Sequence, residues 1–274
     1  MRLLVCLPLC LLLAPTYPRK PLAAVDNLAQ QVPTSKQVVD KSLPDPAADP
    51  IGFLEACLKR YEQQKIRAYS LEFHKQERID GEQQPLEVVL VSYRDEPYSV
   101  FFHWIQPPRR SVQRALYVEG QNKGSDGKSR VKVYTSLGLT FDKDPNGAEA
   151  KKYGRYPINT FGLRQAMELV LKSWRAAKAE NTLHVEYLGQ EVVQQTGGRT
   201  CYKFRRPKYA RPESEDGASG LTVYIDCETL LQVGSIVLGQ DGKELGVYFF
   251  RNIRLNPEFP AWRFDADAIR KDKD

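Results

Sequence analysis

The sequence is poor in the residues that enzymes most often use as bases, nucleophiles and metal ligands. Its 274 residues include only three histidines, five cysteines and two methionines. The histidines are scattered, and none has a second histidine two, three or four residues away. No Cys-x-x-Cys, His-Glu-x-x-His, Gly-x-Ser-x-Gly or Walker-A pattern occurs. The sequence therefore predicts neither a zinc ribbon nor one of the common hydrolase or nucleotide sites, and no cofactor or metal is expected.

Long apolar runs are also lacking. The longest begins after Arg2 and covers residues 3–14, which is shorter than the ~20 residues that span a bilayer. Pro15 ends the run, and Leu22-Ala23-Ala24 offers a small-residue cleavage site. This pattern is typical of a secretory signal peptide, so residues 1–24 are predicted to be removed. We expect an exported protein of the periplasm or cell envelope with no transmembrane helix in the mature chain, compatible with peripheral membrane association.

A strong charge of one sign is missing as well. The net charge is +6, and three of these charges lie in the predicted signal peptide. The remaining lysines and arginines form no basic stripe, which argues against nucleic acid as a partner. Residues 25–48 are rich in Gln, Pro, Asp and Ser and have no hydrophobic period, so they are predicted to be a flexible linker. Residues 49–274 are predicted to form a single domain.

Two stretches have the apolar spacing of a helix. Asp49 and Pro50 predict a helix start, and an apolar stripe runs from Phe53 to Tyr61. A second stripe covers residues 163–174, with Thr160 as the expected capping residue. Such stripes usually pack into a core.

Most of the remaining sequence alternates with the period of two that is typical of strands. The strands are expected at residues 67–79, 85–93, 98–105, 112–118, 130–134, 183–188, 199–206, 221–225, 232–238 and 245–253. This spacing predicts an α+β, mainly antiparallel fold in which strands from both sides of the central helix join one sheet. The charged tail 262–273 is expected to close one edge of it.

Two of these strands are apolar on both faces. Along residues 245–253, Val247, Phe249 and Ile253 share one face, while Tyr248 and Phe250 share the other. Residues 98–105 are similarly rich in aromatic side chains. Such a sheet must be covered on both sides, or it must leave apolar surface for a ligand.

The mature chain keeps three cysteines, and an exported protein can pair two of them. Cys201 falls opposite or diagonal to Cys227 if their strands form a hairpin, so these two are predicted to form a disulfide. Cys57 is expected to remain unpaired on the first helix.

One histidine has a potential catalytic neighbour. His74 and Glu72 lie two apart on a predicted strand and could act as a base with its orienting carboxylate. A surface pair without catalytic function is the simpler interpretation, so no catalytic residue is assigned and the protein is expected not to be an enzyme.

The chain resembles an exported bacterial family, the domain of unknown function 1571. The resemblance is carried by LYVEGQN at residues 116–122, DPNGAEA at 144–150 with RYPI at 155–158 and FGL at 161–163, and FFRNIRLNP at 249–257. In layout the chain is more distantly similar to the lipoprotein carriers LolA and LolB and to the stress regulator RseB. This similarity implies a curved, incomplete β-barrel of about 9–11 strands, with helices on its concave side and an apolar cavity.

The resemblance implies that such a cavity takes a lipid or a lipoprotein acyl chain. Five large side chains on the aromatic strands and the second helix are the candidate lining residues: Phe101, Trp104, Met167, Trp174 and Phe249. Two alternatives remain open. The same fold can serve as a protein-interaction or envelope-stress module that binds an envelope protein, and an envelope hydrolase would use His74.

Overall fold

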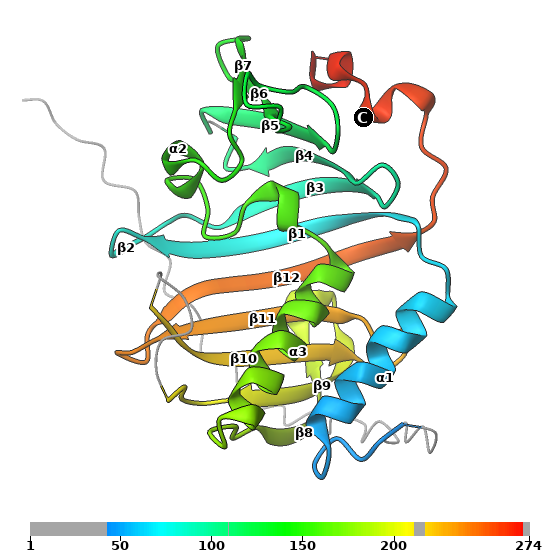
Figure 1. Cartoon of the computed structure of the whole chain (residues 1–274), viewed down its shortest axis with the longest axis vertical. Helices are drawn as coiled ribbons and strands as arrows, with labels where there is room; N and C mark the ends of the chain where they lie inside the picture. The colour runs from blue at the N-terminus through cyan, green and yellow to red at the C-terminus, as the bar shows by residue number, and fades with distance from the viewer. Residues whose placement is uncertain (1–42, 109, 211–216, 271–274) are drawn as a thin grey trace, which may run out of the picture. The chain divides into compact units, whose positions relative to one another are not determined.

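A computed structural model of the chain describes residues 43–108, 110–210 and 217–270. The predicted signal peptide, residues 1–24, lies outside this part of the chain, as does most of the predicted linker. The described residues form a twelve-stranded antiparallel sheet, three α-helices and four short 3-10 helices (Figure 1). Within this part, no helix combines the length and apolar character needed to cross a membrane.

The sheet is open, with β7 and β8 as its two edges. Its order is β7-β6-β5-β4-β3-β1-β12-β11-β10-β9-β8, and β2 pairs with β1 beside this path. In chain order the strands are β1 (Ala68–Ile79), β2 (Glu82–Gln83), β3 (Glu87–Arg94), β4 (Ser99–Gln106), β5 (Val112–Val118), β6 (Val131–Thr135), β7 (Thr140–Lys143), β8 (Glu186–Val193), β9 (Arg199–Arg206), β10 (Ala218–Asp226), β11 (Gln232–Gly239) and β12 (Glu244–Leu255).

The expectation that strands from both sides of the central helix join one sheet is confirmed. The first strand, β1, lies at the centre and pairs with β3 on one side and with the last strand, β12, on the other. Phe73, for example, is in register with both Val89 and Phe250. The α+β, mainly antiparallel class is therefore correct, and the added strands are short or lie at an edge.

Helix α1 (Pro50–Gln63) begins where the sequence predicts. The Asp49 side chain accepts a hydrogen bond from the Gly52 amide at 2.9 Å, and Pro50 occupies the first turn. The apolar stripe of α1 is buried, including Cys57. Arg175 of the central helix donates to Glu55 at 2.8 Å, which links the two helices at their exposed sides.

The central helix α3 (Leu163–Ala179) starts differently from the prediction. Thr160 does not cap it, because Thr160 belongs to the short helix η1 (Ile158–Thr160). Gly162 precedes the first turn and has no side chain to offer. The Leu163 amide instead donates to the phenol oxygen of Tyr69 on β1, at 3.0 Å. The sheet itself thus supplies the cap.

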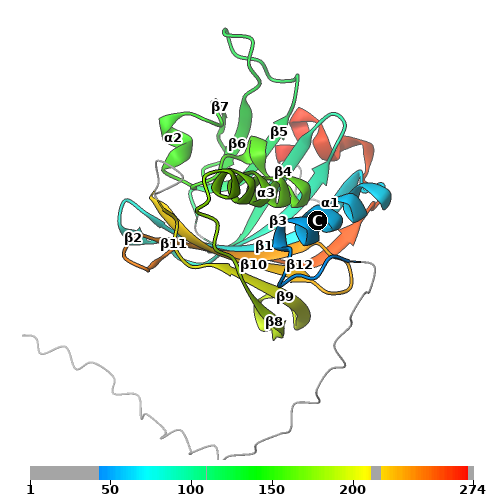
Figure 2. The ribbon, with the colours of Figure 1, turned by 60° about the horizontal axis from the view of Figure 1, so that its bottom comes forward.

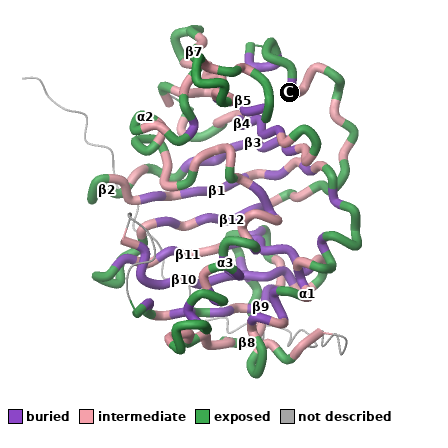
Figure 3. Tube along the Cα trace, viewed as in Figure 1, coloured by how far each residue is buried: buried purple, intermediate pink, exposed green. Residues whose placement is uncertain are grey.

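Helices α1 and α3 lie over one face of the sheet (Figure 2). Tyr69, Leu71 and Phe73 of β1 point toward this face and are buried. A second buried cluster lies around Phe101, Leu116 and Val118, which the tail covers. The buried residues therefore run along the central strands (Figure 3). For clarity, the side that carries α1 and α3 is called the helix face, and the other side the outer face.

The chain's end differs from the expectation that it closes an edge. After β12 it forms η3 (Ala261–Phe264) and η4 (Ala266–Arg270), which lie mainly against β4, β5 and β6. At its end, Arg270 donates to the Thr140 hydroxyl of the edge strand β7 at 3.3 Å. Ile269 is fully buried there. The tail therefore covers apolar side chains on the outer face.

Candidate functional site

A cavity of about 960 Å³ lies between the helix face of the sheet and the segment that includes α3. Strands β1, β3, β4, β5, β6, β7, β10, β11 and β12 contribute to its wall, as do η1 and the short helix α2 (Ala148–Lys151). Its apolar lining includes Phe73, Val89, Phe102, Trp104, Val112, Ala115, Val131, Val133, Ile158, Phe161, Val170, Leu221, Val237, Tyr248 and Phe250.

Aromatic rings form the centre of this wall. The Phe73 ring lies 5.3 Å from that of Phe161 and 5.2 Å from that of Phe250. Phe161 and Phe102 meet edge to face, with ring centroids 5.0 Å apart. Phe161 precedes α3 in sequence, so these contacts tie the start of the central helix to three strands. The rings make a rigid apolar surface rather than a polar cleft.

Tyr98 holds the segment between η1 and α3 over the sheet. Its hydroxyl points to the Phe161 carbonyl oxygen at 2.7 Å and to the Ile158 carbonyl oxygen at 3.1 Å. Burial raises the pKa of Tyr98 far above its usual range, so the phenol stays a hydrogen-bond donor at any physiological pH.

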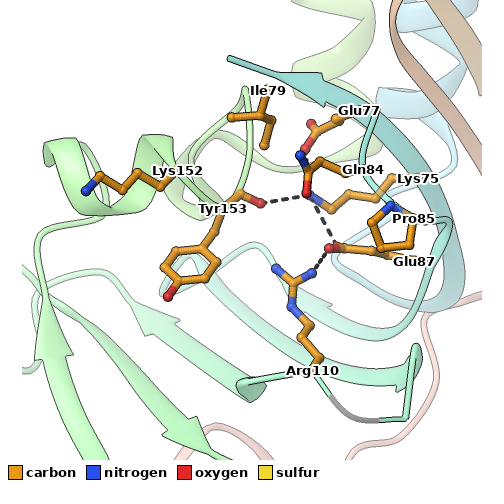
Figure 4. Close-up of a pocket in the computed structure, with 9 residues that line it drawn as sticks. All are labelled: Lys75, Glu77, Ile79, Gln84, Pro85, Glu87, Arg110, Lys152 and Tyr153. Atoms are coloured by element: carbon orange, nitrogen blue, oxygen red, sulfur yellow. Dashed lines mark hydrogen bonds and ion pairs between the residues drawn. The ribbon is translucent and has the colours of Figure 1, made fainter. Parts of the chain in front are cut away.

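One end of the cavity is polar and charged. Lys75 and Glu77 on β1, Glu87 on β3 and Arg110 surround a small side pocket of about 50 Å³ (Figure 4). Lys75 lies 2.8 Å from Glu77 and 3.4 Å from Glu87. Arg110 forms an ion pair with Glu87. We call these four side chains the charged cluster.

The charged cluster also fixes the segment that follows α2. The Lys75 ammonium donates to the Tyr153 carbonyl oxygen at 3.2 Å. Glu77 accepts hydrogen bonds from the Arg155 amide at 3.3 Å and from the Tyr248 hydroxyl at 2.8 Å. Burial lowers the pKa of Lys75, and the charge of Glu77 opposes that shift. A buried pair is costly unless its remaining hydrogen bonds are satisfied, and these contacts meet that requirement.

Arg110 is held between two aromatic rings. Its guanidinium carbon lies 4.8 Å from the centre of the Trp104 ring and 5.9 Å from that of Tyr153. The Trp104 indole N–H donates to Glu87 at 2.9 Å, so the same carboxylate contacts both residues. Burial lowers the pKa of Arg110 to about 10, and Arg110 remains charged at neutral pH.

Only one of the five side chains predicted to line the cavity is part of its wall. Trp104 lies there, beside Arg110. Met167 and Trp174 are fully buried in the core instead, where Trp174 lies 6.0 Å from Phe204 of β9. They fill space between helix and sheet and do not reach the cavity.

Phe101 and Phe249 lie on the outer face, which corrects their predicted position. Phe101 packs with Leu116 beneath the tail, and Phe249 lies 5.5 Å from Tyr224. Because side chains alternate along a strand, their neighbours Phe102 and Phe250 take the places on the cavity wall.

The sequence did not lead us to predict the charged cluster, although the alternation along β1 contains a sign of it. Lys75 and Glu77 continue the alternation of Tyr69, Leu71 and Phe73, so they belong to the apolar face of β1. Two charged residues on an apolar face are unusual unless they are paired, and this pattern alone pointed to a buried polar site.

His74 and Glu72 do form a pair, but not in the cavity. Their side chains approach to 3.3 Å, and Asn252 also donates to Glu72, at 2.6 Å. Both residues alternate with Phe73 and Lys75, so they lie on the outer face. Among the described residues, no group of three or more His, Cys, Asp and Glu side chains could hold a metal ion.

The three cysteines in the described part of the chain, Cys57, Cys201 and Cys227, are free thiols. Cys201 of β9 is in register with Asp226 of β10, and the Cys227 amide donates to the Thr200 carbonyl oxygen at 2.9 Å. Cys227 therefore lies opposite Thr200, one residue out of register with Cys201. Their pairing in an oxidising compartment stays a prediction.

The comparison with protein families gives a clear assignment. The profile described as "Protein of unknown function (DUF1571)" matches residues 66–270. The chain belongs to the DUF1571 family. The match includes every strand of the sheet and α3, and it ends with η4. None of the curated proteins matches the chain.

Several solved structures are similar in fold at low sequence identity. A DUF1329 family protein from Desulfovibrio piger is 11% identical, with a TM-score of 0.40, and the match covers 82% of this chain and 100% of that one. A putative outer membrane lipoprotein-sorting protein domain from Vibrio parahaemolyticus is 9% identical, with a TM-score of 0.37 and coverage of 80% and 100%. A chain of the Pseudomonas aeruginosa MucA/MucB complex is 14% identical, with a TM-score of 0.44, and the match covers 79% of this chain and 62% of that one.

Proposed function

We propose that this DUF1571 protein binds an apolar ligand, such as a lipid or the acyl chain of a lipoprotein, in the cavity beneath α3. The single observation that carries this proposal is the cavity's combination of size and lining. Its volume of about 960 Å³ lies at the upper end of the range of small-molecule sites, roughly 300–1,000 Å³. A packed core has few voids larger than a water molecule.

The lining suits a chain of methylene groups. Phe73, Phe102, Phe161 and Phe250 meet at the centre of the wall, while Val112, Val131 and Val133 extend it toward β6. Each methylene removed from water contributes about 0.8 kcal/mol, so an acyl chain can bind firmly without a catalytic group. The function is therefore proposed to be carriage or sequestration rather than bond-breaking, in the envelope to which residues 1–24 would direct the chain.

Native mass spectrometry of the protein purified from its own envelope provides the first test. A co-purifying lipid supports the proposal, and uptake of a fluorescent fatty acid measures the affinity. Ala115→Phe fills the cavity from β5, because Ala115 is buried and lies on the wall. This variant should lose most of the uptake while still unfolding cooperatively.

Ala176→Phe is the matched control, since Ala176 is exposed on α3 and is not part of the cavity wall. It should take up the fluorescent fatty acid like the wild type. A clean apo mass combined with no uptake by the wild-type protein would refute the proposal.

A protein-binding role is the second candidate, favoured by the β6–β7 hairpin. Leu137 at its tip is 82% exposed, and Leu139 beside it is 52% exposed, whereas Phe141 further along β7 lines the cavity. Exposed apolar residues that gather on one element can mark an interaction site. Cross-linking in cells from a photoreactive residue at position 137 would trap a protein partner under this alternative, and lipid should then be absent from the purified protein.

A further inference from the structure

The cavity is long in one direction. Its wall takes side chains from nine neighbouring strands, from β7 at one edge of the sheet to β10. Neighbouring strands lie about 4.8 Å apart, so the wall extends roughly 38 Å along the curved sheet. The hydrocarbon core of a bilayer is about 30 Å thick and contains two leaflets, so one acyl chain reaches roughly 15 Å. A single chain would therefore cover less than half of this wall.

A segment of the chain crosses the wall near its middle. Residues 153–161, which we call the crossing segment, lead from α2 to α3 over β1 and β12 (Figure 1). The Arg155 amide donates to Glu77 of β1 at 3.3 Å, and the Tyr156 ring lies 5.7 Å from that of Tyr248 of β12. These contacts hold the crossing segment against the sheet, and the remaining lining residues fall into two groups on either side of it.

The first group forms an arm of the cavity between α2 and the strands from β3 to β7. Its wall beyond the charged cluster is made of Val112, Ala115, Val131, Val133 and Phe141. The side chains come from β5, β6 and β7. This first arm is the more apolar of the two, so a ligand with one hydrocarbon chain would occupy it first.

The second group forms an arm between α3 and the strands β10 and β11. Its apolar side chains are Ala166, Leu169 and Val170 of the helix and Leu221 and Val237 of the sheet. Gln232 and Ser235 of β11 add polar groups to this wall. A chain confined to the first arm would leave the apolar surface of the second arm in contact with water, which is unfavourable.

We propose that the ligand has two hydrocarbon chains, as a diacyl lipid does, with one chain in each arm. The crossing segment is one chain wide, so the two arms begin close together and one branch point can serve both. Joining the chains in one molecule makes the second insertion intramolecular, which strengthens binding. The assignment rests on the proposed function. It adds a ligand class, two-chain lipids, and identifies the second arm as the part of the wall that recognises them.

Two acylglycerols test the assignment, 1,2-dioctanoylglycerol and 1-octanoylglycerol, each measured by displacement of the bound fluorescent fatty acid. Ser235→Phe places a ring in the second arm, since Ser235 is half-buried and lies on its wall. The variant should lose at least tenfold in affinity for the two-chain ligand, the equivalent of about two methylene contacts. It should bind the one-chain ligand like the wild type. Each comparison is made with one ligand, so that ligand's own aversion to water cancels.

A second variant and two controls accompany this measurement. Leu221→Trp narrows the same arm from β10 and should have the same selective effect as Ser235→Phe. Ala115→Phe blocks the first arm and should weaken both ligands. Ser125→Phe is the matched control, because Ser125 is exposed between β5 and β6 and is not part of the cavity wall. It should alter neither affinity.

The outcomes separate this assignment from the proposed function. If the folded second-arm variants weaken neither ligand, or weaken both equally, the second arm does not recognise a second chain and the assignment is wrong. Uptake of the fluorescent fatty acid would still support the cavity proposal. If neither variant folds, native mass spectrometry of the wild type decides: one dioctanoylglycerol should saturate the protein, and two bound copies would overturn the assignment. If neither acylglycerol nor the fluorescent fatty acid binds, the proposed function itself fails.

Discussion

The phenol oxygen of Tyr69 lies 3.0 Å from the backbone nitrogen of Leu163, which donates a hydrogen bond to it. Tyr69 belongs to the central strand and Leu163 is the first residue of the central helix. The Tyr69 ring also stacks on Tyr93 at 4.3 Å. One side chain therefore fixes both the start of α3 and its place over the sheet, and the roof of the cavity depends on it.

Tyr69→Phe should destabilise the fold, because the first turn of α3 would lose its cap while the ring stacking remains. Losing a helix cap or a buried hydrogen-bond partner costs about 1–2 kcal/mol. The free energy of unfolding in urea measures the change. Tyr187→Phe is the matched control, since that hydroxyl makes no hydrogen bond within the described residues, and it should stay within about 0.5 kcal/mol of wild type.

The same phenol predicts an alkaline sensitivity. Burial raises the pKa of Tyr69 well above its usual value of 10.0. Below pH 10 the group is protonated in both folded and unfolded states, so its stabilising effect is complete. Above pH 10 the unfolded chain releases the proton first, and stability is lost as the pH rises, by up to about 1.4 kcal/mol per pH unit.

Comparison of the wild type with Tyr69→Phe isolates this effect. Lys75 and Arg110 change the stability in the opposite direction as the pH rises, because burial lowers the pKa of each. Both residues are present in both proteins, so their effect cancels in the comparison. Urea unfolding between pH 10 and pH 12 should show a shallower loss of stability in the variant. Parallel pH profiles would show that Tyr69 ionises equally in both states.

The sequence predicted the strands well because alternation is local. Residues 112–118 were predicted as a strand and β5 has the same bounds, while β1 begins one residue later than expected. The start of α1 was also correct, since Asp49 caps a turn three residues away. The prediction that Thr160 caps α3 was wrong because the cap is not local: Tyr69, which caps Leu163, is 94 residues away in the sequence. A tertiary contact replaced the local rule.

Alternation could not say which face of a strand meets the cavity. On β4 and β12 both faces are apolar, because the tail buries Phe101 and the Tyr224 side chain covers Phe249. The alternation then divides each strand into two sets of apolar side chains, but it does not say which set faces the cavity. Choosing between Phe101 and Phe102, or between Phe249 and Phe250, required the pairing of β1 with both β3 and β12.

The three cysteines should be unreactive in the reduced, folded protein. Burial raises the pKa of Cys57, of Cys201 and of Cys227 to about 12. The thiolate is the reactive form, so labelling with a thiol reagent at pH 8 should be slow until urea is added, when all three should react. Cys57 and Cys201 are buried and Cys227 is partly buried, so fast labelling of the native protein would contradict their raised pKa values.

The predicted Cys201–Cys227 disulfide is tested on protein taken from its own envelope. Unreduced peptide mapping should find these two cysteines linked, and only Cys57 should label in urea before reduction. Three labelled cysteines would show that the thiols remain free in the cell. Cys201→Ser should then leave the labelling of Cys227 unchanged relative to Cys57.

His74→Ala separates ligand binding from catalysis. His74 lies on the outer face beside Glu72, so the variant should take up the fluorescent fatty acid with unchanged affinity. The hydrolase alternative predicts instead that turnover of an envelope substrate disappears. A loss of turnover with normal binding would establish an enzyme whose reacting groups lie away from the cavity.

The tail should stabilise the fold without contributing to ligand binding. Ile269 of η4 is fully buried against the outer face, in the same cluster as Phe101 and Leu116. Ile269→Ala should lower the free energy of unfolding by about 2–5 kcal/mol, the range for deleting buried methyl groups. Leu137→Ala removes a side chain of similar size that is 82% exposed and should change stability by less than about 0.5 kcal/mol.

Ligand uptake is the decisive second measurement for this pair. The tail and the cavity lie on opposite faces of β4 and β5, where Phe101 and Leu116 face the tail while Phe102 and Ala115 line the cavity. Ile269→Ala should therefore bind the fluorescent fatty acid like the wild type below its unfolding transition. A parallel loss of stability and uptake would mean that the sheet transmits the tail's packing to the cavity, and that the two faces do not act independently.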